Sequence, residues 1–222
     1  MRLAVFDLDG TLVDSLTDLA DSVNILLQGY GLPKQDAEAV RGMIGDGVAA
    51  LVERALLRSG MPAPEIDRTE ATSRFMDIYG PRATEHSRLF PGTGTALTLM
   101  RDQGWTLAVC TNKPVTAARA ILDSFGLTDL LSAVSGGDSF ATRKPDPAPL
   151  LGTISLAGGD PGRTVMIGDH ANDIHAATSA GTRSIFAGWG YGTATCADGA
   201  TATATRISDV PDLAAHLLPE TS

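Results

Sequence analysis

The sequence predicts an α/β protein in which a doubly wound, parallel β-sheet is interrupted by an inserted group of α-helices. Three observations lead to this prediction. A short apolar run at residues 3–6 has the length of a buried strand and leads directly into acidic residues. From about residue 14 to residue 79, apolar side chains recur at helical spacing with no convincing strand between them. After residues 90–92, apolar runs alternate with helical patterns, which is typical of a parallel sheet covered on both faces.

Within the insert, two amphipathic stretches predict helices, with turns at residues 29–33 and 60–64. Their apolar positions are Leu16, Leu19, Ala20, Val23, Leu26 and Leu27, then Val48, Leu51, Val52, Ala55 and Leu56. Beyond the insert, Thr93 is the predicted N-cap of a helix that ends near residue 104.

Strands and helices then alternate to the end of the chain. Strands are predicted at residues 105–110, 132–135, 164–167 and 183–186, and helices at residues 115–125, 148–157, 174–180 and 210–218. Residues 188–205, rich in Gly, Ala and Thr, are predicted to form a loop. The expected organisation is therefore a catalytic core of residues 1–14 and 86–222, interrupted by a helical unit of residues 15–85.

Composition narrows the possible functions. The chain has 222 residues, 43% hydrophobic and 19% charged, and no apolar run reaches the ~20 residues that span a bilayer. Asp7 interrupts any secretory signal, and Cys110 and Cys196 are too few for a disulfide framework, so we expect a cytoplasmic protein without a membrane partner. A net charge of −9 with scattered bases argues against nucleic-acid binding. The chain is expected to be a monomer or a small homo-oligomer.

Two acids, Asp7 and Asp9, directly follow the first predicted strand. Residues two apart in an extended run point to the same side, so we expect both carboxylates to face one pocket. Two adjacent carboxylates repel each other unless a cation or a shared proton lies between them, and Mg²⁺ prefers such oxygen ligands. An isolated pair of this kind is more often an acidic turn or a helix N-cap, and that alternative remains open from these residues alone.

Two further groups could meet a phosphate. Thr111 and Asn112 follow another predicted strand, where a hydroxyl and an amide can donate to phosphate oxygens. They could equally cap the helix that begins near Pro114. Lys144, followed by Pro145, could hold the charge of a phosphoryl group or neutralise nearby carboxylates, although a lone loop lysine is usually solvated.

Asp169 and Asp173 complete the set. Asp169 follows a strongly apolar strand as a candidate metal ligand, whereas Asp173 falls in the next helix's first turn, where the helix dipole favours acids. All these groups follow predicted strands, and doubly wound sheets bind ligands at the carboxyl ends of their strands. Together they supply carboxylates, neutral donors and an ammonium group.

The motifs occur in a recognisable order. They are Asp7-Leu8-Asp9-Gly10-Thr11-Leu12-Val13-Asp14-Ser15, Thr111-Asn112-Lys113-Pro114, Lys144-Pro145-Asp146-Pro147, and Gly168-Asp169 with Asp173. In this order the chain resembles the haloacid dehalogenase superfamily, in which a helical cap covers a Rossmann-like core. Within that superfamily it is most similar to the phosphoglycolate phosphatases, through Gly45-Asp46-Gly47, Phe90-Pro91-Gly92 and Gly136-Gly137-Asp138.

The resemblance implies a magnesium-dependent phosphatase that hydrolyses a small phosphate monoester, 2-phosphoglycolate to glycolate. It implies that Asp7 attacks phosphorus and forms an aspartyl-phosphate, while Asp9 protonates the leaving alkoxide and later activates water. The implied Mg²⁺ ligands are the Asp7 carboxylate, the Asp9 backbone carbonyl and Asp169, with Asp173 behind them or bound through water. The implied phosphate ligands are Thr111, Asn112 and Lys144.

Several alternatives remain at this stage. A phosphomutase or a phosphonate hydrolase with the same cap is the nearest one, and a receiver-like phosphoacceptor module is an alternative from another class. In the cap, Arg41, Gly45 and Gly47 are candidate contacts to a substrate carboxylate, although a simple turn between helices explains them equally well. His170 stands where many relatives have a small hydroxyl residue, and we expect it to face solvent.

Overall fold

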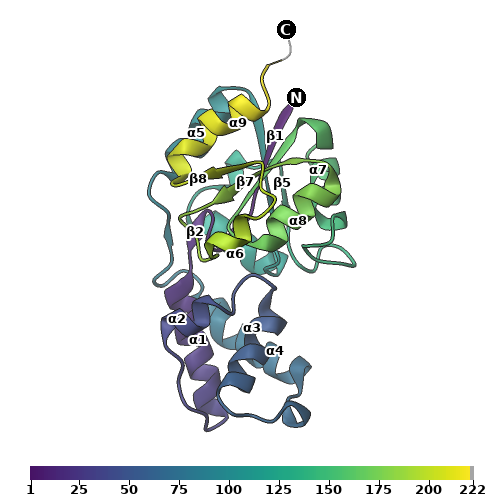
Figure 1. Cartoon of the computed structure of the whole chain (residues 1–222). Coiled ribbons are helices and arrows are strands. Elements are labelled where there is room, and N and C mark those ends of the chain that lie inside the picture. Colours follow the sequence, from purple (N-terminus) through teal and green to yellow (C-terminus); the bar gives the residue numbers. More distant parts are fainter. Residues whose placement is uncertain (221–222) are drawn as a thin grey trace.

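The computed structural model describes residues 1–220 and contains a parallel sheet between two layers of helices, with a further group of helices beneath it in the view of Figure 1. The sheet strands are β1 (Arg2–Phe6), β4 (Trp105–Cys110), β5 (Ala133–Ser135), β6 (Thr164–Gly168), β7 (Arg183–Ala187) and β8 (Ala202–Ala204). They pair in parallel in the order β5-β4-β1-β6-β7-β8. The chain builds one half of the sheet outward from β1 and then returns to build the other, as predicted for a doubly wound fold.

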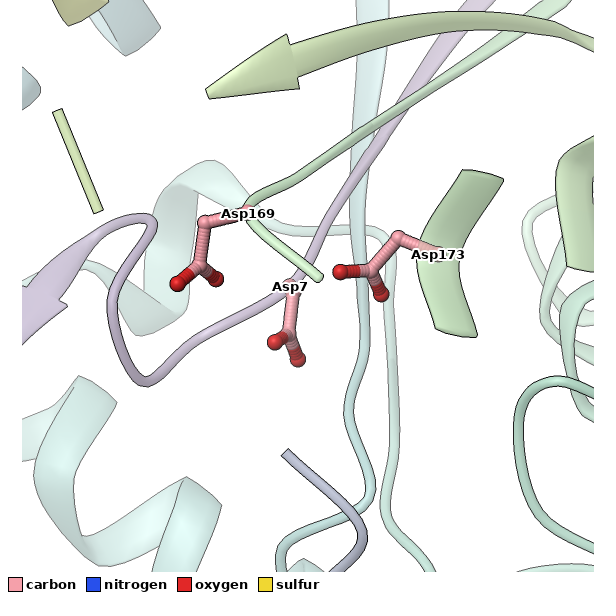
Figure 2. Close-up of side chains that lie close together, drawn as sticks. All are labelled: Asp7, Asp169 and Asp173. Atoms are coloured by element: carbon pink, nitrogen blue, oxygen red, sulfur yellow. The ribbon is translucent and has the colours of Figure 1, made fainter. Parts of the chain in front are cut away.

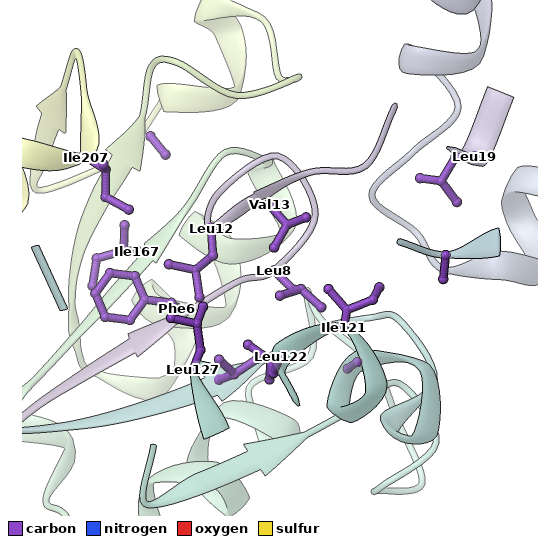
Figure 3. Close-up of a cluster of buried hydrophobic side chains, with 14 of the residues drawn as sticks. Phe6, Leu8, Leu12, Val13, Leu19, Ile121, Leu122, Leu127, Ile167 and Ile207 are labelled. Atoms are coloured by element: carbon purple, nitrogen blue, oxygen red, sulfur yellow. The ribbon is translucent and has the colours of Figure 1, made fainter. Parts of the chain in front are cut away.

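Alternation along β1 divides the packing between the two faces of the sheet. Ala4 and Phe6 belong to a large apolar cluster that includes side chains from α5 (Thr93–Asp102), α6 (Val115–Ser124) and α9 (Val210–Leu217). Part of this cluster is drawn in Figure 3. Leu3 and Val5 point to the opposite face and pack with residues of α7 (Ala148–Leu156) and α8 (Ala171–Ala180). The central strand is therefore covered on both sides.

The inserted residues form α1 (Leu16–Gly29), α2 (Ala37–Arg41), α3 (Val48–Arg58) and α4 (Arg68–Tyr79), which we call the helical unit. Their buried faces carry the predicted apolar positions except Leu16, which is partly buried, and Phe75 and Tyr79 of α4 join them. The chain enters and leaves the unit through β2 (Val13–Asp14) and β3 (Arg88–Leu89), which pair with each other antiparallel. The two connections to the sheet therefore lie side by side.

Asp18 fastens these connections together. Its buried carboxylate, in the first turn of α1, accepts hydrogen bonds from the backbone N–H groups of His86 and Ser87, at 2.9 and 2.8 Å, and from the Ser87 hydroxyl at 2.6 Å. An ionised acceptor with three donors makes strong hydrogen bonds. The start of the helical unit is thereby fixed to the segment that leads back to the sheet.

Two details of the sequence prediction are wrong. Gly92, with φ of 92°, is the N-cap of α5, whereas Thr93 is the first helical residue and its hydroxyl donates to the Phe90 carbonyl at 2.9 Å. The predicted loop at residues 188–205 contains β8 and a short 3₁₀ helix (Ala194–Ala197). β8 consists of small residues without an apolar pattern, and it pairs with the edge of β7.

Short 3₁₀ helices complete the connections, at Ala63–Glu65, Gly80–Arg82, Thr128–Leu130, Pro161–Arg163 and Ile207–Asp209, besides the one above. None of the helices within residues 1–220 is both long enough and apolar enough to cross a membrane.

Candidate active site

Three buried carboxylates meet at the carboxyl ends of the central strands. Asp7 follows β1, Asp169 follows β6, and Asp173 lies in the first turn of α8. Each offers an oxygen, and these oxygens lie within 4.8 Å of one another (Figure 2). β1 and β6 pair side by side in parallel, so their carboxyl ends lie next to each other. This brings together Asp7 and Asp169, which are far apart in the sequence.

Lys144 lies directly behind these carboxylates. Its Nζ is 2.6 Å from Asp173 Oδ1 and 3.1 Å from Asp7 Oδ1, and it donates to the Cys110 carbonyl at 2.5 Å. Burial alone would lower the pKa of Lys144, but Asp173 and Asp7 raise it above its ordinary value, so the ammonium group is charged. The alternative of a solvated loop lysine is therefore wrong.

Asp7 is the carboxylate with an unused oxygen. Its Oδ1 is buried and makes no hydrogen bond within the described residues, because the nearby Lys144 ammonium lies outside hydrogen-bonding geometry. Burial raises the pKa of Asp7, Lys144 lowers it, and Asp173 raises it again, with a net increase. An orphaned carboxylate oxygen among two other acids is a fitting ligand for a hard cation.

Asp169 is held rigidly by the segment that follows β7. Its Oδ2 accepts from the Tyr191 backbone N–H at 2.7 Å, and its Oδ1 accepts from the Thr11 hydroxyl at 3.1 Å. A Cβ atom at Gly190 would lie 2.3 Å from the Asp169 Cβ, so only glycine permits this approach. The sequence alone predicts no role for this segment, although its glycines at positions 188, 190 and 192 are a usable signal of close backbone contact.

Asp9 has different partners from Asp7. Its carboxylate accepts from Lys113 Nζ at 2.9 and 3.0 Å and from the Ser15 hydroxyl at 2.6 Å, and it caps no helix. Lys113 also donates to the Tyr79 hydroxyl at 2.8 Å. Burial alone would lower the pKa of Lys113, but Asp9 and Tyr79 raise it, and burial raises the pKa of Tyr79 to about 12. Lys113 and Tyr79 were not among the predicted site residues.

Thr111 and Asn112 both lie at the site, but the side-chain amide of Asn112 already has hydrogen-bond partners within the protein. Its Nδ2 donates to the backbone carbonyls of Gly45 and Lys144, at 3.0 and 2.9 Å, and its Oδ1 accepts from the Lys144 N–H at 3.0 Å. Both amide hydrogens are thus engaged, and the side chain ties the Lys144 loop to the helical unit. Neither residue caps α6, whose N-cap is Pro114.

A cavity of about 40 Å³ separates the sheet from the helical unit. Its lining residues from the sheet side are Asp7, Asp9, Thr111, Asn112 and Lys113, and those from the helical unit are Leu19, Ile44, Gly45, Gly47, Val48 and Leu51. The predicted pairing of Asp7 and Asp9 in one pocket thus matches the geometry. Gly45 and Gly47 lie on the wall, whereas Arg41 lies outside it, 5.8 Å from the Tyr191 ring centre.

His170 is partly buried between the two units, contrary to the expectation that it faces solvent. Its Nδ1 lies 3.2 Å from Asp169 Oδ2, and a Cβ atom at Gly45 would lie 2.5 Å from its ring. Burial alone would lower the pKa of His170, but the contact with Asp169 raises it to about 9. Nearby, Asn172 donates to Asp46 Oδ1 at 2.6 Å, which forms another contact to the turn before α3.

Known proteins are similar to this chain in sequence and in fold. A model of the haloacid dehalogenase-like hydrolases matches residues 4–187. A phosphoglycolate phosphatase of Agrobacterium fabrum is 41% identical over 189 residues, which cover 85% of this chain and 81% of that protein. One of Chromobacterium violaceum is 36% identical over 214 residues, covering 96% of each chain. The crystal structure of a predicted phosphoglycolate phosphatase from Haemophilus somnus has a TM-score of 0.89 and 34% identity, covering 96% of this chain and 97% of that one. The chain belongs to the haloacid dehalogenase-like hydrolase family.

Proposed function

We propose that the chain is a magnesium-dependent phosphatase that transfers the phosphoryl group of a small ester first to Asp7 and then to water. Its family and its relatives make it a phosphoric monoester hydrolase. The observation that carries the rest of the proposal is the buried group of Asp7, Asp169 and Asp173 with Lys144 behind it.

The charges around the site support a divalent cation. When all are ionised, the four carboxylates of the site, the ammonium groups of Lys113 and Lys144 and the His170 imidazolium leave a formal charge of minus one. This negative charge would repel a phosphate dianion, whereas Mg²⁺ would offset it, and the unbonded Oδ1 of Asp7 is a suitable ligand atom. Asp7, Asp169 and the Asp9 carbonyl would hold the ion. When bound, it would withdraw charge from the phosphoryl oxygens and reduce their repulsion of the nucleophile.

Asp7 is the proposed nucleophile. It lines the cavity, and its carboxylate oxygen would form a bond to phosphorus as the bond from phosphorus to the ester oxygen breaks. Lys144 supports this step by holding a positive charge 3.1 Å from the attacking carboxylate, and Thr111 supplies a buried hydroxyl to the phosphoryl side of the cavity. Removing such a charge typically costs about 10²-fold or more in rate.

Asp9 is the proposed proton carrier. It lines the same cavity as Asp7, and in its protonated form it would donate a proton to the ester oxygen as the alcohol leaves and become a carboxylate. In the second step it would accept a proton from water, while the water oxygen binds phosphorus and the bond to Asp7 breaks. Inorganic phosphate is then released, and both carboxylates return to their starting forms.

We propose 2-phosphoglycolate as the substrate, in keeping with the names of the relatives. The cavity is small, and the residues that line it from the helical unit are apolar apart from the backbone at Gly45 and Gly47. Backbone N–H groups in this turn and at the start of α3 could receive the substrate carboxylate, because Gly47, the N-cap, makes no side-chain cap. Residues 15–85 would thus act as a cap that limits the size of the alcohol.

A panel of small phosphate esters, assayed with Mg²⁺ and with a chelator, tests this proposal. We expect phosphate release that needs Mg²⁺ and is fastest with 2-phosphoglycolate. Asp7→Asn should abolish turnover, whereas Asp102→Asn, at an exposed position on α5, serves as the control. Rapid acid quenching followed by mass spectrometry should locate the transferred phosphate on Asp7. Full activity of Asp7→Asn would contradict the proposed nucleophile.

A further inference from the structure

Lys113 is a buried cation that the proposed reaction does not use. Its side chain is only 3% exposed, and its ammonium group contacts both carboxylate oxygens of Asp9, at 2.9 and 3.0 Å. The charge beside the nucleophile comes from a different residue, Lys144. Burying a lysine side chain costs free energy that its contacts must offset, so the contacts of Lys113 indicate what it does.

The third contact of Lys113 comes from the helical unit. Its Nζ donates to the Tyr79 hydroxyl at 2.8 Å and lies 4.6 Å from the centre of that ring. Tyr79 is the last residue of α4, is fully buried, and stacks on Phe75 at 5.5 Å between ring centres. Tyr79 therefore holds Lys113 from the point where the chain turns back toward the sheet.

These contacts hold the ammonium group from both units. Both oxygens of Asp9 accept from it on the sheet side, and the hydroxyl of Tyr79 accepts from it on the side of the helical unit. Lys113 also lines the cavity, but its contacts are with Asp9 and Tyr79. The geometry thus separates Lys113 from Lys144, which lies beside the proposed nucleophile.

We infer that Lys113 is a positioning residue that holds the Asp9 carboxylate in one orientation, and that Tyr79 fixes Lys113 from the end of α4. The inference rests on the proposed role of Asp9 as proton carrier. Lys113 contacts both oxygens of the carboxylate, which restricts its rotation more than a single hydrogen bond would. A proton donor held in one orientation needs no reorganisation when the ester oxygen departs.

The chemistry of the leaving group provides a test. An alkoxide such as that of glycolate needs a proton as it leaves, whereas p-nitrophenolate leaves without one. A residue that acts through the proton donor should therefore matter for 2-phosphoglycolate and not for the first turnover of p-nitrophenyl phosphate. A residue that binds the phosphoryl group should matter equally for both. The first turnover is used because later turnovers also need water activation by Asp9.

The experiment compares single-turnover rates of both esters at saturating Mg²⁺. Asp9→Asn should slow the alkyl ester by about 10²- to 10⁴-fold, the usual range for general acid catalysis. Lys113→Met should slow the alkyl ester by about 10- to 100-fold, as expected for a misplaced catalytic group, and the first turnover of the aryl ester by less than about threefold. Lys34→Met is the matched control, because Lys34 is exposed on the helical unit, and it should change neither rate.

A double variant removes the remaining ambiguity. If Lys113 acts through Asp9, then Lys113→Met should add little to the loss already caused by Asp9→Asn, whereas independent roles would multiply. Equal losses for both esters in Lys113→Met would overturn the inference and leave the proposed function intact. Equal losses for both esters in Asp9→Asn would instead overturn the proposed role of Asp9.

Tyr79→Phe gives a second route if Lys113→Met fails to fold, as judged by circular dichroism. It keeps the ring that stacks on Phe75 and removes only the hydroxyl that holds Lys113. We expect a selective loss of about three- to tenfold for the alkyl ester, with the rate of the aryl ester unchanged, from the loss of one hydrogen bond. Unchanged rates for both esters, or an equal loss for both, would contradict the inference.

Discussion

Substituting Gly47 with alanine, and comparing it with the same change at Gly60, should distinguish the effect of backbone strain on stability from the effect of the spacing between the two units on activity. Gly47 has φ of 88° and lines the cavity, and Gly60, elsewhere in the helical unit, has φ of 96°. A side chain at such a φ costs roughly 1–2 kcal/mol. Gly47→Ala and Gly60→Ala should therefore lose about the same free energy of unfolding from backbone strain.

The two sites differ in their surroundings. A Cβ atom at Gly47 would lie 3.0 Å from the backbone oxygen of Asn112, so the helical unit must move away by a few tenths of an ångström, whereas at Gly60 no atom lies within 4 Å. Displacing a catalytic contact by a full ångström can cost about 10²-fold, so we expect about a three- to tenfold lower kcat/KM in Gly47→Ala alone.

Urea unfolding and steady-state kinetics on a small phosphate ester, carried out on both variants, provide the assay. The expected result is a similar loss of stability in both and a loss of activity confined to Gly47→Ala. An equal loss of activity in Gly60→Ala would show that general weakening of the helical unit is responsible. Wild-type activity in Gly47→Ala would refute the reasoning that the spacing at Asn112 matters.

Three further predictions concern the connections around the site. Asp18→Ala should lower the free energy of unfolding by about 3 kcal/mol in urea, because it leaves two backbone donors and the Ser87 hydroxyl without their charged acceptor; a loss below about 1 kcal/mol would contradict this. Burial alone would raise the pKa of Asp46, but hydrogen bonds from Asn172 and Arg54 lower it below its ordinary value, so its stabilising effect is present at neutral pH and is lost as the pH falls through the folded-state pKa. As the pH is lowered from neutral through the folded-state pKa of Asp46, the Asp46→Asn variant should therefore lose less free energy of unfolding than the wild type. Urea unfolding at several pH values measures this difference. Tyr191→Phe should lower stability by about 1–2 kcal/mol without changing the Mg²⁺ concentration for half-maximal activity, because its backbone N–H still holds Asp169.

The sheet could be predicted because the sequences of its inner strands are strongly apolar. β4 and β6 are buried on both faces, so their residues form continuous apolar runs that are easy to recognise. β8 could not be predicted in this way, since Ala202–Ala204 has neither bulk nor alternation. It is a strand because the edge of β7 offers free backbone groups, which is a property of the assembled sheet.

The same distinction applies to the candidate site. Asp7, Asp169 and Lys144 could be placed together because the ends of parallel strands converge, whatever the side-chain conformations. Lys113 and Tyr79 could not, because their contact depends on side-chain direction and joins residues 34 positions apart. Asn112 shows the same limit. The sequence predicts that its side chain lies at the site, but it does not predict that both amide hydrogens are donated to backbone carbonyls.

In the proposed reaction, this arrangement would divide recognition of the substrate between the two units. Among the described residues that line the cavity, every charged side chain comes from the sheet side, whereas the helical unit supplies Leu19, Ile44, Val48, Leu51 and two glycines. In the proposed reaction, the sheet side would therefore hold the phosphoryl group without reference to the alcohol attached to it. The helical unit would select that alcohol by size and through backbone groups. The resemblance through strand-end motifs consequently says much about the reaction and little about the substrate, whose identity depends on a wall that those motifs do not include.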